Sequence, residues 1–150
     1  MFQALQSAIL LNMGTYRFFD HAADVGISVW AESLPDLFVT AFQGLMAWIG
    51  SPPDAAEHVE EEISLSAEDL DELLVRWLQE VLYLFHLRHA YWIQASGVQV
   101  TGKSATGRIR GIRFNLAQSK DYQEVKAVTY HQLQVREENG RWRANLILDI

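Results

Sequence analysis

The stretch ISVWAESLPDLFVTAFQGLMAWI, residues 27–49, contains the change of apolar period from which the fold class follows. Apolar residues first alternate, which predicts a strand over residues 27–32. Ser33 then suits a helix N-cap, because a proline stands just inside the helix start. The apolar residues that follow recur at helical spacing and form one stripe: Leu34, Leu37, Phe38, Ala41, Phe42, Leu45, Met46 and Ile49.

A second helix and more strands follow along the chain. Residues 58–66 alternate as a strand, and Ser66 is expected to cap a helix with Asp69 at the capping-box position. The apolar stripe of that helix contains Leu70, Leu73, Leu74, Trp77, Leu78, Val81, Leu82 and Phe85. Four more strands are expected at residues 92–101, 105–115, 125–137 and 141–150, with a polar loop at residues 116–124. Asn139-Gly140 predicts a tight hairpin turn between the last two strands.

These elements give the order β-α-β-α-β4 and an α+β fold. We expect a mostly antiparallel sheet packed against two amphipathic helices, which cover one face of the sheet. A chain of 150 residues with 49% hydrophobic content fits one globular domain. We assign that domain to residues 16–150, and we expect residues 1–15 to be a poorly ordered extension with Met13 as an alternative start.

Composition excludes several kinds of site. The chain has no cysteine, so disulfides, thiolate metal sites and cysteine nucleophiles are excluded, and a cytoplasmic location is expected. No stretch is apolar for long enough to cross a membrane. Twelve basic and 19 acidic residues give a net charge of −7, so strong direct nucleic-acid binding is not expected. This charge suits a bound cation or a basic protein surface.

The first candidate site is the segment FDHAADVG, residues 19–26. Asp20, His21 and Asp24 lie within five residues, and aspartate oxygens suit hard divalent cations. Gly26 would let the backbone bend or approach another segment closely. Alternatively, the two aspartates are loop caps and the histidine is a hydrogen-bonded polar residue, which composition alone favours.

The second candidate is the C-terminal segment LILDI, residues 146–150. Asp149 falls on the opposite strand face from the apolar residues beside it. Its side chain, the carbonyl of Ile150 and the terminal carboxylate could together supply hard oxygen ligands. Alternatively, this is a frayed end with a solvated aspartate.

The third candidate is EVKAVTYH, residues 124–131. Lys126 and His131 could form an acid/base pair, but five residues along a regular strand place them on opposite faces. Spacing therefore favours a structural role, in which Lys126 offsets a nearby carboxylate and Thr129, Tyr130 and His131 supply hydrogen bonds.

Two weaker patterns have ordinary alternatives. His86 and His89 have a spacing that a metal could use, although histidines near a helix C-terminus more often complement the helix dipole. Two arginine pairs, Arg108 with Arg110 and Arg141 with Arg143, each share a strand face. Each pair could bind a phosphate or an acidic partner, or simply be solvated.

Taken together, these segments resemble the archease family over residues 16–150. The resemblance is carried by residues 21–26 (HAADVG), 33–38 (SLPDLF), 67–85, 125–131 (VKAVTYH) and 142–150, which ends in LDI. The family often has threonine where this chain has Ala22, which is not one of the proposed metal ligands. The family's fold matches the element order predicted above.

The resemblance implies a function without catalysis by the chain itself. Archeases are protein cofactors of the RtcB-type RNA ligase, whose guanylylation and repeated turnover they promote in tRNA splicing and RNA repair. The resemblance also implies a divalent cation, Ca²⁺ or alternatively Mg²⁺ or Mn²⁺, held by Asp24, Asp149 and Ile150. His21, Lys126, Thr129, Tyr130 and His131 are expected to support the site or face the partner.

Elementary electrostatics agrees with a cation at this place. If the C-terminal strand lies beside strand 27–32, Asp24 and Asp149 meet at one end of the sheet, where they repel unless a cation or proton neutralises them. Two other functions stay open. One is a metal-dependent phosphoester hydrolase that uses Asp24, Asp149 and His21, and the other is a general chaperone or adaptor.

Overall fold

The computed structural model of this protein describes residues 14–129 and 134–150, and residues 1–13 and 130–133 lie outside the described part. The described elements are β1 (Thr15–His21), β2 (Asp24–Ala31), α2 (Leu34–Ile49), β3 (His58–Ser66), α3 (Leu70–Arg88), β4 (Ala90–Val100), β5 (Ser104–Arg113), α4 (Leu116–Ser119), β6 (Ala127–Thr129), β7 (Arg136–Glu138) and β8 (Arg141–Asp149). The predicted α+β class, with antiparallel strands and two amphipathic helices, is confirmed.

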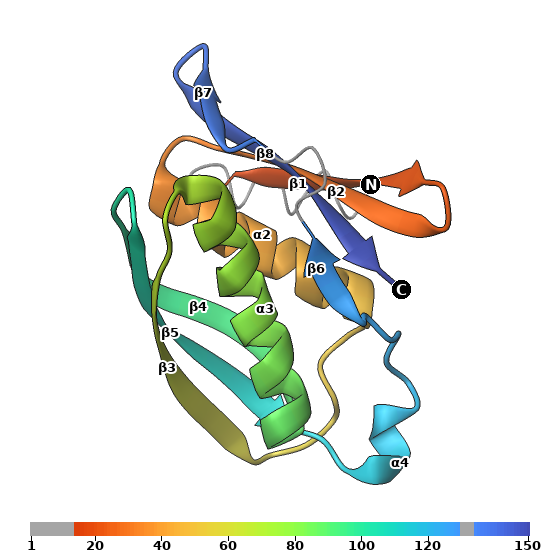
Figure 1. Ribbon diagram of the computed structural model, residues 1–150. Coiled ribbons are helices and arrows are strands. Elements are labelled where there is room, and N and C mark those ends of the chain that lie inside the picture. Colours follow the sequence, from red (N-terminus) through yellow and green to blue (C-terminus); the bar gives the residue numbers. More distant parts are fainter. Residues whose placement is uncertain (1–13, 130–133) are drawn as a thin grey trace.

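The strands form two sheets, whereas one sheet was predicted. In the larger sheet β1, β2, β8 and β6 are neighbours in that order, and β7 also pairs with β8; the smaller sheet has the order β3-β5-β4. The two long helices lie between the sheets: α2 packs against β2 and β4, and α3 packs against β3, β4 and β6 (Figure 1). The prediction of a single sheet was wrong because half-buried strands alternate between apolar and polar residues in the same way whichever sheet they join.

The first helix is delimited as its sequence predicts. The Ser33 hydroxyl oxygen accepts a hydrogen bond from the backbone N–H of Asp36 at 3.3 Å, which satisfies one of the free donors of the first turn. Gly50 ends the helix, and its N–H donates to the carbonyl of Met46 at 3.1 Å.

The second long helix begins later than predicted. Asp69, and not Ser66, is its N-cap, and the Asp69 carboxylate accepts from the backbone N–H of Glu72 at 2.9 Å. Ser66 is instead the last residue of β3. The pairing of Ser66 with Ser104 keeps Ser66 in β3, so the helix begins three residues later, at the residue that was predicted to occupy the capping-box position.

The two helices meet over a fully buried tryptophan. The Trp77 indole N–H donates to the carbonyl of Phe38 at 3.1 Å, and the two rings lie 5.9 Å apart between centroids. The indole N–H of Trp77 is therefore hydrogen-bonded inside the protein, which offsets the cost of removing it from water.

A strand absent from the prediction precedes β2. β1 covers residues that were expected to be extension and loop, and it forms a hairpin with β2 in which His21 lies opposite Asp24. Ala22 in the turn has φ +52°, a conformation more typical of Gly or Asn. Thr15, assigned to the extension, begins β1. The expected disorder of residues 1–13 falls outside the described residues.

The predicted strand over residues 125–137 is two short strands on one edge of β8. Thr129 pairs with Ile147 and Arg136 with Arg143, so an advance of seven positions on this side matches an advance of four positions along β8. β6 and β7 therefore do not share one regular register with β8. The predicted Asn139-Gly140 hairpin is confirmed: both residues have positive φ, +53° and +77°, and they join β7 to β8.

Across residues 14–129 and 134–150, no helix combines the length and the apolar character that a membrane crossing requires.

Gly26 provides a test of how β1 packs on β2. A Cβ atom at Gly26 would lie 2.1 Å from the ring of Phe19, which is opposite it in the register. We expect Gly26→Ala to lower the free energy of unfolding by about 1–3 kcal/mol, because the Phe19 ring must move. Urea denaturation followed by tryptophan fluorescence measures this change.

Gly102→Ala is the matched control, because a Cβ atom there meets nothing within 4 Å, and its cost should stay within about 0.5 kcal/mol. In a Phe19→Ala background the Gly26→Ala penalty should largely vanish. An equal penalty in both backgrounds would contradict the packing explanation.

Candidate functional site

Asp24 and Asp149 lie across from each other at one end of the larger sheet. β2 and β8 pair antiparallel in a continuous register that begins with Val25 opposite Leu148. One further residue in this register brings Asp24 opposite Asp149, and side chains in such pairs have Cβ atoms roughly 4.5–5.5 Å apart. The condition for convergence that the sequence posed, the last strand beside β2, is met.

Both carboxylates belong to the outer face of this sheet. Val25 and Leu148 are buried in the core between the sheets, so their neighbours Asp24 and Asp149 point to the opposite face. Both aspartates are half-buried. Like charges at opposed positions on neighbouring strands repel each other, and a cation between them would relieve the repulsion.

Lys126 and Ile150 extend the same end of the sheet. The backbone N–H of Lys126 donates to the carbonyl of Asp149 at 2.7 Å, and Ala127 then pairs with Asp149 in β6. This fixes the backbone just before Ile150, whose side chain is 39% exposed. The Lys126 side chain is exposed. The strand ends of β2, β8 and β6 therefore meet beside one another (Figure 1).

Of the residues that were predicted to support the metal site, some lie near Asp24 and Asp149. His21 is half-buried and pairs with Asp24 on the side away from Asp149. Thr129 pairs with Ile147, two residues before Asp149. Tyr130 and His131 lie outside the described residues, so their predicted role is not tested.

Side-chain ligands at this end of the sheet are few. Within residues 14–129 and 134–150, no group of three or more His, Cys, Asp or Glu side chains is arranged to hold a metal ion. The donors that the described part can offer are two carboxylates and backbone oxygens, which are the hard oxygen ligands that Ca²⁺ and Mg²⁺ prefer. The donor type fits such a cation, and the remaining ligands would be water or a partner's groups.

Two apolar side chains, Phe19 and Ile147, lie beside the carboxylates, and the sequence analysis did not predict them there. The Phe19 ring lies over Gly26 on the outer face, and Ile147 in the next strand is only 5% exposed. The close approach predicted for Gly26 is therefore confirmed, with Phe19 as the group that approaches. The alternation of Phe19 with His21 was the available signal, because it places both on one strand face.

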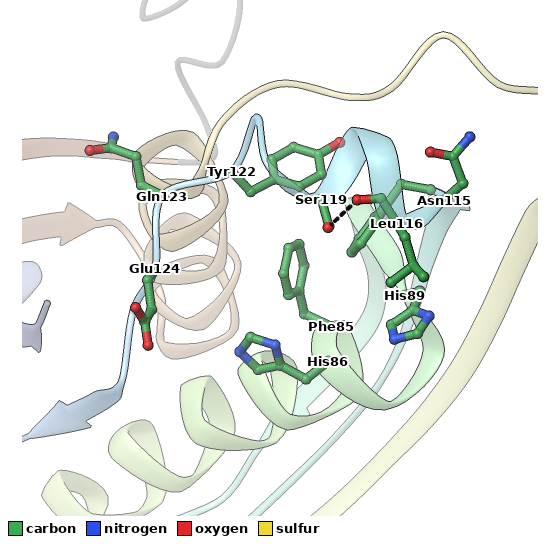
Figure 2. A pocket seen from close by; sticks show the side chains of 10 residues that line it. Phe85, His86, His89, Asn115, Leu116, Ser119, Tyr122, Gln123 and Glu124 are labelled. Atoms are coloured by element: carbon green, nitrogen blue, oxygen red, sulfur yellow. Dashed lines mark hydrogen bonds between the residues drawn. The ribbon is translucent and has the colours of Figure 1, made fainter.

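A second feature is a pocket of about 240 Å³ at the C-terminal end of α3 (Figure 2). Its lining residues are Phe85, His86, His89, Phe114, Asn115, Leu116, Ser119, Tyr122, Gln123 and Glu124. Burial raises the pKa of Tyr122, and the nearby Asp121 raises it further. His89 has φ +49° as the residue that ends α3, so it does not continue the helical spacing that suggested a metal site with His86.

The arginine pairs singled out in the sequence are mostly engaged in ion pairs. Arg108 contacts Glu62 at 2.9 Å, Arg141 contacts Glu32 at 3.5 Å and Arg143 contacts Glu138 at 3.2 Å. Ion pairs on exposed faces contribute little to stability.

Comparison with known proteins places this architecture in one family. Residues 16–150 match the model of the Archease protein family (MTH1598/TM1083). The chain is 36% identical to the protein archease of Methanopyrus kandleri over 140 residues, which cover 87% of this chain and 96% of that protein. It is 31% identical to the protein archease of Pyrococcus furiosus over 142 residues, which cover 92% and 100% respectively.

Solved structures agree with the sequence comparison. The solution structure of protein 1598 from Methanobacterium thermoautotrophicum is similar with a TM-score of 0.69 at 27% identity, covering 90% of this chain and 98% of that chain. The fold also resembles a crystal structure of an archease from Thermotoga maritima, described as a possible chaperone, with a TM-score of 0.62 at 19% identity over 88% and 94% of the two chains. With a matching family model over residues 16–150, a shared fold and relatives above 30% identity, the chain belongs to the archease family.

Proposed function

We propose that this protein is a metal-binding cofactor of an RtcB-type RNA ligase in the cytoplasm. In this proposal Asp24, Asp149 and oxygens of Ile150 hold one divalent cation, Ca²⁺ in the first place and Mg²⁺ or Mn²⁺ as alternatives. The bound cation promotes guanylylation and repeated turnover of the ligase in tRNA splicing and RNA repair. The chain itself catalyses no step.

The register of β2 with β8 is the observation that carries the proposal. It brings together two acids that are 125 positions apart in the sequence, on a sheet face that is not the core face. Fold stability does not require two like charges at this place, and directly opposed like charges on neighbouring strands cost stability. A bound cation that neutralises the two carboxylates would remove this cost and would account for their position.

The position of the carboxylates also suits action on a partner. Asp149 is the last residue of β8, and Ile150 beyond it is partly exposed. With few protein ligands of its own, a cation here would keep coordination positions for water, for a nucleotide phosphate or for a group of the ligase. It could therefore help to place metal or nucleotide in the ligase active site.

A general chaperone is the second candidate. It is supported by the description of the Thermotoga maritima relative as a possible chaperone. Among the described residues, the exposed apolar side chains of Tyr83, Leu87 and Leu116 also support it. Exposed apolar groups are the surface that holds unfolded clients. Suppression of the aggregation of unrelated unfolded proteins would favour this function, and dependence on one ligase would not.

Removing one carboxylate should have opposite effects with and without Ca²⁺. In buffer that contains a metal chelator and no added Ca²⁺, Asp24→Asn should raise the free energy of unfolding by roughly 0.2–1 kcal/mol, because one of two opposed like charges is lost. With Ca²⁺ at about 100 times its Kd, the natural chain should gain ~2.7 kcal/mol and the variant almost nothing. Thermal denaturation by circular dichroism, with and without Ca²⁺, measures both effects.

Asp54→Asn is the matched control, because Asp54 is exposed and lies in the connection between α2 and β3. It should show the same Ca²⁺ response as the natural chain. An undiminished Ca²⁺ shift in Asp24→Asn would remove Asp24 from the ligand set.

The effect on the ligase is tested by following transfer of labelled GMP from GTP to the cognate enzyme. The natural chain and Asp54→Asn should both accelerate guanylylation, whereas Asp24→Asn and Asp149→Asn should lose about tenfold or more of the acceleration, as is typical when groups that orient a metal are mutated. Circular dichroism of each variant shows that it remains folded.

Equal guanylylation with and without the protein would refute the proposal. Hydrolysis of a phosphoester by the purified protein alone would instead favour the metal-dependent hydrolase.

A further inference from the structure

The pocket at the end of α3 has aromatic walls. The rings of Phe85, Phe114 and Tyr122 lie within 5.0–5.6 Å of one another between centroids, and all three line the pocket. Figure 2 shows Phe85 and Tyr122 side by side, with His86 near the one and Leu116 across from the other. Aromatic rings offer a negative face to cations within about 6 Å.

The titratable groups that line this pocket are one glutamate, two histidines and one tyrosine. Glu124 is the acidic residue among the described lining residues, and none of these is Lys or Arg. The pocket also adjoins the last turn of α3, where the helix dipole is negative. Arg88 in that turn does not offset this dipole within the pocket, because it pairs with Glu61 on β3 at 2.5 Å.

The size of the pocket restricts its occupant. At about 240 Å³ it is smaller than the roughly 300–1,000 Å³ of pockets that bind cofactors and drug-sized ligands. A single side chain is a better match. Leu116 at the edge is 77% exposed and offers an apolar surface for the stem of such a side chain.

We propose that this pocket receives an arginine side chain from the surface of a partner protein. A guanidinium group is planar and weakly hydrated, so it stacks on aromatic rings better than the ammonium group of lysine does. In the pocket it lies against Phe85 and Tyr122, with Glu124 as its counter-charge. The inference concerns only the chemistry of the pocket, and it does not depend on the metal site or on the ligase.

The place of the pocket in the chain fits a docking role. Glu124 precedes Ala127 by three residues, which limits the distance between their Cα atoms to about 11 Å. Ala127 pairs with Asp149 at the end of the larger sheet. A partner that contacts this end of the sheet is therefore within reach of the pocket.

Three capped pentapeptides test the proposal by two-dimensional amide NMR of the full chain. They are acetyl-Gly-Gly-X-Gly-Gly-amide with arginine, citrulline or phenylalanine at X. Citrulline has nearly the shape of arginine without the charge. The arginine peptide should shift the amide signals of residues 114–124 with a millimolar Kd. The citrulline peptide should bind more weakly.

Glu124→Gln should weaken the arginine peptide about two- to fivefold, the usual effect of an exposed ion pair. Glu137→Gln is the matched control, because Glu137 is an exposed glutamate on β7, and it should leave binding unchanged. The dispersion of the NMR signals shows directly that each variant is folded. Equal binding of the citrulline peptide, tighter binding of the phenylalanine peptide, or no shift at residues 114–124 would each overturn the proposal.

Discussion

The antiparallel pairing of β2 with β8 is the constraint on which the larger sheet and its candidate site depend. β8 has β2 on one side and both β6 and β7 on the other, so it holds the sheet together. Its inner face contributes Ala144, Leu146 and Leu148 to the core, and its outer face ends in Asp149. A shift of this register by one residue would exchange the two faces and bury the aspartate. Packing of the core thus fixes the position of the carboxylates.

Local signals in the sequence predicted most elements but not their assembly. Ser33 and Gly50 delimit α2 as expected, because capping depends on neighbouring residues alone. The hairpin of β1 and β2 was missed because its turn contains Ala22. This residue has a positive φ, but alanine is not among the residue types that signal such a turn in a sequence. The division into two sheets was missed because strand pairing depends on contacts between distant segments, which a period of two does not encode.

The candidate site was predictable where single residues stood out. Asp24 and Asp149 are conspicuous because each interrupts an apolar pattern next to a strand, and the resemblance to archeases links them as ligands of one cation. Phe19 and the pocket at the end of α3 were not predicted. Phe85, Phe114 and Tyr122 come from separate segments, and each one alone looks like an ordinary core residue. Only the tertiary structure shows that they share a cavity with Glu124.

The central place of β8 also has a consequence for how the protein is made. β8 is translated after every other described strand, so the larger sheet lacks its middle strand until β8 has been made. At that stage the nascent chain already contains β1 and β2, and the edge of β2 that pairs with β8 in the folded protein is still unpaired. Such unpaired edges attract other chains. The nascent chain is therefore exposed to aggregation through this edge until the nine residues of β8 have been made and paired with β2.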